Sequence, residues 1–454
     1  MQSNHEKLFT QTPLLKMLLI IVVPGAISML TSALYDIIDG ILVGNILGET
    51  AFAAINLAMP YVIILFSIGD LIGVGSAVPI SIKLGEKDHE AANNIFSYSV
   101  VMLFVGGIGM GLLMFFAAPL LISLQGATGE LARISIIYLR IYALFIPVSG
   151  MMFAIDNYLK VCGKVNRSMG LNILMAVSGA IIEAILLIVF HLDVWAAALA
   201  YSLAMVIASV IGLWPFIRNK MVLSFVRPRP TVTITKQIVM AGFSAFLNNI
   251  AGRIVSIVLN ARILALGGTQ AISIFGIMMF TNSFVVALIY GTTDSLQPAI
   301  GYNWGAQNYK HAFDIGKSSF IVSAIFSLSY VVLLHFFPEF AVRIFIFNAS
   351  DDFVVAATSA FDLLSLQWLT RWFVLACDAF LLACGQSNRA VWLSVASSIA
   401  LPLATIVLLS PLGLTGVWLT SAISDGISAL FGAWLLIDFL HKHGYKAKKK
   451  AIHE

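Results

Sequence analysis

Charged residues are scarce in this chain of 454 residues, where they make up only 11%. Soluble domains usually carry about 25% charged residues, so the composition excludes an ordinary water-soluble protein. Hydrophobic residues make up 60%, the mean hydropathy is +0.96, and no long polar stretch interrupts the chain. This excludes a disordered chain and a large appended soluble domain, and it places the whole chain in a membrane.

Motifs for metal, redox and nucleotide chemistry are also missing. The three cysteines Cys162, Cys377 and Cys384 form no CxxC pair, and the eight histidines show no metal-ligand spacing. Neither HExxH, GxSxG nor the P-loop GxxxxGK[ST] occurs. We therefore expect no cofactor, no enzymatic activity and no ATP-driven transport, with an intramembrane enzyme as a remote alternative only.

Long apolar runs dominate the chain. They reach 17 residues or more without alternating polar positions, which favours helices over the alternating strands of roughly ten residues in an outer-membrane barrel. A helix crosses a bilayer with about 20 apolar residues. The runs predict an all-α polytopic membrane protein with twelve transmembrane helices, near residues 14–35, 50–82, 93–124, 138–159, 169–190, 195–216, 238–266, 271–300, 318–337, 354–382, 390–410 and 414–439.

Basic residues in the loops indicate the orientation. The side that includes the N-terminus collects twenty lysines and arginines, against four on the opposite side. The positive-inside rule therefore predicts that both termini are cytoplasmic and that the protein lies in the cell membrane. We expect the basic tail 441–454 to contact lipid headgroups, and we expect no nucleic-acid partner.

The two halves of the chain repeat with an offset near 220 residues. The clearest pair sets CGKVNR at 162–167 against CGQSNR at 384–389, with Asp156 and Asp378 at the same offset before them. Six spans in each half give parallel repeats, an arrangement typical of alternating-access transporters with a central site. The predicted domains are an N-terminal lobe 1–216, a cytoplasmic linker 217–237, a C-terminal lobe 238–440 and a basic tail 441–454.

Several motifs carry a family resemblance. The stretch LYDIIDG at 34–40, with Val43-Gly44, Leu47-Gly48, Ala53-Ala54 and Met59-Pro60 after it, resembles the first-span signature of the multidrug and toxic compound extrusion (MATE) family. Further matching motifs are KLGE at 83–86, QPAIGYNWGA at 297–306 and GLTGVW at 413–418. The likeness covers essentially the whole chain and leans towards the MepA-like branch of bacterial drug exporters.

The resemblance implies a V-shaped pair of six-helix lobes that acts as a monomer. It implies export of drugs and organic cations in exchange for H⁺ or Na⁺. The family's first-span acid falls on Asp39 and its fifth-span acid on Glu183. Many family members have an asparagine where this chain has Gly179, and a threonine is common where it has Tyr201. These two differences leave open whether the sodium-binding site of the family forms here.

Ionisable residues inside the spans are functional candidates, because each costs at least about 2.5–3.5 kcal/mol in the hydrocarbon. Asp36 and Asp39 are three residues apart and share a helix face. If both face a dry lobe with Glu183, the three carboxyls titrate as a unit, and we predict them as the ion-coupling group. An exposed acid at a helix end is the alternative for Asp39. The candidates include Asp36, Asp39, Asp70, Asp156, Glu183, Arg253, Asp294, Arg371, Asp378 and Asp425.

A second set is predicted to bind substrate. Asn249 and Arg253 lie on one face of the seventh span, where Arg253 is expected to face the cleft or to pair with Asp294 or Asp378; a polar helix seam is the alternative. Aromatic rings and methionines suit flat cations, although most of these residues serve packing. The predicted residues are Asp156, Asn157, Asn249, Arg253, Asp294, Asp378, Tyr142, Met152, Phe153, Met278 and Phe280.

A flippase or exporter of lipid-linked or polar metabolites is the competing function. A carrier of anionic lipids would favour a cationic cavity. Only Arg253 and Arg371 lie inside the spans, against seven or more acids, which disfavours that alternative.

Overall fold

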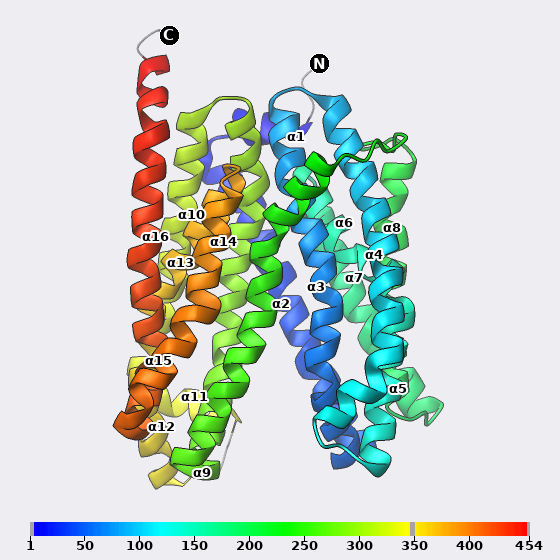
Figure 1. Ribbon diagram of the computed structural model, residues 1–454, viewed down its shortest axis with the longest axis vertical. Coiled ribbons are helices and arrows are strands. Elements are labelled where there is room, and N and C mark those ends of the chain that lie inside the picture. Colours follow the sequence, from blue (N-terminus) through cyan, green and yellow to red (C-terminus); the bar gives the residue numbers. More distant parts are fainter. Residues whose placement is uncertain (1–3, 346–349, 452–454) are drawn as a thin grey trace. The chain divides into compact units, whose positions relative to one another are not determined.

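The computed structural model describes residues 4–345 and 350–451, without the side chains of residues 4, 36, 41, 44, 45, 49, 52, 269, 344, 345 and 443–451. All regular structure in the described part is helical (Figure 1). Eleven helical stretches are long and apolar enough to cross a membrane, and the last, Ser387–Lys442, is interrupted at Gly413, whose φ is 73°. Since α15 and α16 on either side of this turn pack against each other, the described residues make twelve crossings, as predicted.

The first compact unit, unit 1, contains Met1–Ile250 and Gly301–Gln307. Its helices pack through small residues: a Cβ on Gly111 of α4 would lie 2.4 Å from the carbonyl oxygen of Ala143 in α5, so only glycine permits this backbone approach. The elements are α1 (Asn4–Thr10), α2 (Leu14–Leu47), α3 (Glu49–Gly85), α4 (His89–Leu124), α5 (Gly129–Ser149), α6 (Met151–Val161), α7 (Val165–Ala184), the π-helical turn Ile185–Val189, α8 (Trp195–Ile217) and the two ends of α9 (Val232–Gly305).

The second unit, unit 2, contains Ala251–Ile300 and Asn308–Glu454. Its helices surround an apolar cluster that includes Phe275, Phe361 and Trp418. The elements are the middle of α9, α10 (Tyr309–Phe336), α11 (Pro338–Phe345), α12 (Asp351–Ser365), α13 (Trp368–Ala383), α14 (Ser387–Val395), the π-helical turn Ala396–Ala400, α15 (Leu401–Leu409), the 3₁₀ turn Ser410–Leu412 and α16 (Gly413–Ala451).

Glycines at repeated sequence positions adopt the same left-handed conformation in both units. The φ values are 84° at Gly48 and 62° at Gly268, and 69° at Gly163 and 72° at Gly385. Gly268 separates the seventh and eighth spans inside α9. These matched turns confirm the internal repeat, because a positive φ favours glycine at each of them.

The segment between α8 and α9 has no helix from residue 218 to 231 and runs along the start of α4. There the backbone N–H of Ser224 donates to Asn93, and that of Arg229 donates to Asn94, at 2.9 and 2.7 Å. The first segment of unit 1 ends at Ile250, inside the predicted seventh span. The proposed role of 217–237 as the linker between lobes stays a prediction.

Large apolar side chains point outwards along the spans. Phe116 of α4 is 73% exposed and Leu430 of α16 is 74% exposed, each inside a long helix. In water such surfaces would be unusual, whereas a lipid environment accommodates them. The chain is therefore a multi-pass membrane protein.

Candidate functional site

Two acids predicted for ion coupling meet inside unit 1. Glu183, near the end of α7, is fully buried, and the hydroxyl of Tyr35 from α2 donates to its Oε2 at 3.2 Å. Its Oε1 has no hydrogen-bond partner among the side chains that the structure describes. The Asp39 carboxyl lies one helical turn after Tyr35 and is close enough to Glu183 for the two carboxyls to interact. The side chain of Asp36, the third predicted acid, lies outside the described part.

Aromatic rings enclose this acid pair. The Tyr35 ring stacks on Tyr201 of α8, with centroids 4.8 Å apart and an angle of 17° between the planes. Tyr201 meets Tyr142 of α5 and Phe66 of α3 edge-on, at 6.3 and 6.4 Å. A Cβ on Gly179 would lie 3.0 Å from the Tyr35 ring. Both family departures, Gly179 and Tyr201, therefore make contact with the same ring.

The acid pair has no basic neighbour in the described residues that forms an ion pair with either carboxyl. Glu183 is fully buried and Asp39 is half-buried. Burying an unpaired charge costs several kcal/mol, and a proton on either carboxyl would remove one of the two charges. A metal site of three or more His, Cys, Asp or Glu side chains is not found in the part of the chain that the structure describes.

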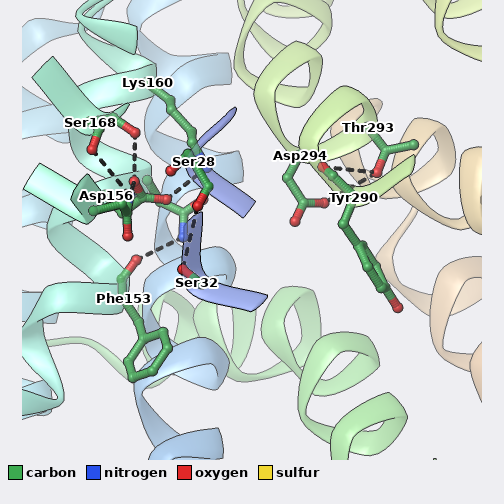
Figure 2. Close-up of polar contacts among 11 residues, drawn as sticks. Ser28, Ser32, Phe153, Asp156, Lys160, Ser168, Tyr290, Thr293 and Asp294 are labelled. Atoms are coloured by element: carbon green, nitrogen blue, oxygen red, sulfur yellow. Dashed lines mark hydrogen bonds and ion pairs between the residues drawn. The ribbon is translucent and has the colours of Figure 1, made fainter. Parts of the chain in front are cut away.

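Asp156 of α6 belongs to a separate polar network in unit 1 (Figure 2). Its Oδ2 lies 2.7 Å from the ammonium of Lys160, whose side chain is only 2% exposed. Its Oδ1 accepts hydrogen bonds from Ser168 and Asn172 of α7 at 2.5 and 2.7 Å. The charge of this acid is thus compensated in the structure, unlike that of Glu183.

Unit 2 holds its own charged groups inside the spans. Arg371 of α13 forms an ion pair with the buried Asp425 of α16 at 2.9 Å. Asp378, also on α13, accepts from the Ser394 hydroxyl at 3.2 Å. Asp294 accepts from Thr293 beside it at 3.4 Å (Figure 2).

The other predicted substrate residues are distributed over buried and exposed positions. Asn249 donates to Asp70 at 2.9 Å, and Asn157 donates to the carbonyl of Phe153 at 2.9 Å. Met152 is buried, and Phe153 packs against Phe66 at 5.6 Å.

In unit 2, Met278 is completely buried in the apolar cluster, whereas Phe280 is 55% exposed. The Arg253 side chain is exposed. The assignment of all these residues to substrate binding stays a prediction.

Three features were missed by sequence reasoning. Lys160 lies four residues after Asp156, a spacing that predicts contact on a helix and could have been read. Tyr35 lies four residues before Asp39 on the same face and could have been included for the same reason. The pairing of Arg371 with Asp425 spans 54 residues and requires the tertiary structure.

A polytopic helical membrane protein with two repeated units and an acid pair inside one of them has the features of a secondary transporter. The MatE family model matches residues 24–185 and 244–408, and the chain therefore belongs to the MATE family. The multidrug export protein MepA of Staphylococcus saprophyticus is 28% identical over 444 residues, which cover 97% of each chain.

Solved structures agree with the fold. An outward-facing multidrug resistance MATE family transporter has a TM-score of 0.90 at 20% identity and covers 96% of this chain and 98% of its own. A MOP superfamily transporter from Pyrococcus furiosus has a TM-score of 0.89 at 21% identity with the same coverage. The chain thus has the two-lobed MATE fold that the sequence predicted.

Proposed function

We propose that the protein exports drug-like, often cationic organic compounds by antiport and alternating access. Three lines support this function: family membership, the similarity to multidrug export proteins along nearly the whole chain, and the acid pair in unit 1. The proposed topology keeps both termini in the cytoplasm, and the proposed working unit is a monomer.

The acid pair carries the proposed coupling. When Glu183 and Asp39 hold a proton, the cluster is less charged and can stay closed under Tyr35. When the proton leaves, two adjacent carboxylates repel each other and require water, which favours a state in which α2 and α7 separate. Pro24 inside α2 and the π-helical turn that follows Glu183 give both helices a place to bend.

The coupling ion in this proposal is the proton. A bound metal cation prefers several oxygen ligands around it. Beside Glu183 the space opposite Gly179 is filled by the Tyr35 ring, and Tyr201 covers that ring from the other side. This packing of carbon around the acids favours a proton, and no further cofactor is needed.

The substrate cation is proposed to bind to the remaining acids and rings. Asp294 and Asp378 of unit 2 are proposed to attract its positive charge, with Asp156, Asn157, Asn249 and Arg253 as further polar contacts. Tyr142, Met152, Phe153, Met278 and Phe280 are the proposed apolar contacts.

Transport in proteoliposomes tests the proposal. Purified protein is reconstituted, and ethidium movement is measured with a pH gradient alone, a sodium gradient alone and neither. We expect uphill ethidium transport with the pH gradient only. Transport driven only by sodium would contradict proton coupling, and movement that neither gradient changes would contradict antiport.

A further inference from the structure

A cavity of about 300 Å³ lies at one end of unit 1, where the chain leaves α6 and α8. Its walls come from His5 of α1, from Cys162 and Lys164 after α6, and from residues 219–222 after α8. None of the residues proposed for coupling or substrate binding lines this cavity. It is therefore a candidate binding site for a ligand other than the coupling ion or the exported substrate.

Two lysines reach the cavity from turns of the same form. Gly163 and Asn219 each have a left-handed backbone, with φ of 69° and 52°. The next residue in each turn, Lys164 or Lys220, donates its backbone N–H to the carbonyl five residues earlier, at 2.8 and 2.9 Å. This helix-ending geometry holds both lysine backbones in place at the wall of the cavity.

The described lining of the cavity contains these two lysines and no acid. Burial lowers the pKa of His5 to about 4, so its imidazole is neutral near pH 7 and adds no charge. The charged groups around His5 are Glu6, which opposes this shift, and His89 and Lys164, which add to it. The lining therefore carries a positive charge that suits an anion.

The wall formed by α1 is firmly packed. A Cβ on Gly163 would lie 3.0 Å from the Cβ of His5, so the helix rests directly on the turn. Asn303 donates to the carbonyl of the buried Phe9 at 2.9 Å, and Tyr302 meets the His5 ring edge-on at 5.6 Å. The cavity is thus a formed feature of unit 1.

The position of the cavity along the membrane normal is indicated by its neighbours in α8. The Arg218 guanidinium lies 4.6 Å from the centroid of the Trp214 ring, and Trp214 is 53% exposed. Tryptophan and arginine at a helix end are typical of the level of the lipid headgroups. At that level the local concentration of anionic lipid headgroups is higher than that of a dilute dissolved anion, so a basic pocket there favours the lipid as its ligand.

We propose that this cavity binds the phosphate of an anionic phospholipid headgroup, with Lys164 and Lys220 as its charged contacts. Lysines near helix C-termini also interact favourably with the helix dipole without any ligand. Lys87 provides the matched case, because it follows the end of α3 without lining the cavity. Lys236 is a second exposed lysine outside the lining.

Native mass spectrometry of the purified full-length chain tests the proposal. The probes are dioctanoyl phosphatidylglycerol, dioctanoyl phosphatidylcholine and glycerol 3-phosphate. We expect one phosphatidylglycerol to bind at least about tenfold more tightly than phosphatidylcholine. The double variant Lys164→Gln/Lys220→Gln should lose this preference, since each lysine near the surface contributes severalfold in affinity.

Two further variants control for net charge and for folding. Lys87→Gln/Lys236→Gln removes the same charge elsewhere and should keep the preference, and Lys164→Arg/Lys220→Arg should restore it. An equal loss in both glutamine variants, or no preference in the unaltered protein, would overturn the proposal. If glycerol 3-phosphate binds as tightly as the lipid, the cavity binds phosphate groups in general, and the proposal that its ligand is a lipid is overturned.

Discussion

The two units share one arrangement of helices but differ at the position of the acid pair. Through the repeat offsets of 220 and 222 residues, Asp39 and Glu183 of unit 1 correspond to Leu259 and Thr405 of unit 2. Leu259 is 5% exposed inside the apolar cluster, and the Thr405 hydroxyl donates to the Leu401 carbonyl at 2.8 Å. The unit 2 scaffold therefore needs no charge at these positions, which agrees with the proposed coupling role of the acids in unit 1.

A second pair of equivalent acids differs in its compensation. Asp156 and Asp378 each accept a hydrogen bond from a side chain sixteen residues later. Asp156 is also paired with Lys160, whereas the equivalent position in unit 2 is Leu382. The repeat thus preserves the hydrogen bond, whereas the lysine four residues after the acid occurs in unit 1 and not at the equivalent position of unit 2.

The largest expected effect follows from removal of the charge on the acid pair. Glu183→Gln and Asp39→Asn each fix an uncharged side chain of the same size, so the two states of the cycle no longer differ in protonation. We expect each variant to insert and bind drug, but to lower gradient-driven uphill ethidium export at least about tenfold. Asp70→Asn, outside the pair, should have a much smaller effect.

The measurement is ethidium export against a gradient, with binding of the dye measured separately. Full pumping by both amide variants would place the coupling elsewhere, first at Asp156, Asp294 and Asp378. Loss of membrane insertion in both would assign the acids a structural role.

The next effect concerns Lys160, which is replaced by Leu382 at the equivalent position of unit 2. Lys160→Met leaves the Asp156 carboxylate buried without its cation, which should lower the free energy of unfolding by about 3–5 kcal/mol. The double variant Asp156→Asn/Lys160→Met removes both charges and should recover most of this loss. Leu382→Met at the equivalent place in unit 2 should change stability by less than about 1.5 kcal/mol.

Denaturant unfolding of the detergent-solubilised variants provides the comparison. A Lys160→Met variant as stable as the starting protein would show that the ion pair does not stabilise unit 1. A double variant no better than the single one would assign the loss to the packing of the lysine stem.

A smaller effect with pH should arise from α1, which belongs to unit 1. His5 has a pKa of about 4 in the folded protein, against an ordinary value near 6.5, because it is buried. Below pH 6.5 the unfolded chain binds a proton that the folded chain does not, so stability falls as the pH decreases from about 6.5 to 4. The full loss is on the order of 3 kcal/mol.

Thermal unfolding at pH 7.5 and pH 5 measures this loss of stability. His5→Gln should remove part of the decrease between the two pH values. An unchanged pH dependence in His5→Gln would contradict the assignment.

The sequence was sufficient for the architecture and for part of the site. Apolar runs and loop charge predict twelve spans, because hydropathy and helix length are local properties. The family motifs placed Asp39 and Glu183 at the site, and the structure brings them together. The Tyr35 hydroxyl joins Glu183 across 148 residues, a contact that no periodicity along one helix can indicate.

The packing of α9 on α3 was beyond sequence reasoning. A Cβ on Gly242 would lie 1.7 Å from the Leu71 carbonyl oxygen, and such a backbone contact depends on the fold. The role of the proline-bearing basic segment 217–237 as the linker between lobes stays a prediction.

The smallest effect tests the aromatic packing that distinguishes the acid pair of unit 1. Gly179→Ala places a Cβ 3.0 Å from the Tyr35 ring, which is held by its stack on Tyr201 and its hydrogen bond to Glu183. We expect a loss of about 1–2 kcal/mol in stability, together with slower export, because the ring has to shift.

Gly170→Ala is the matched control on the same helix, since its Cβ would meet nothing within 4 Å. There alanine should stabilise α7 by about 0.5–1 kcal/mol, because glycine is the poorer helix former. Opposite signs for one substitution on one helix would show that the contact with Tyr35 causes the loss, and equal effects at both positions would contradict the close packing of Tyr35 on α7.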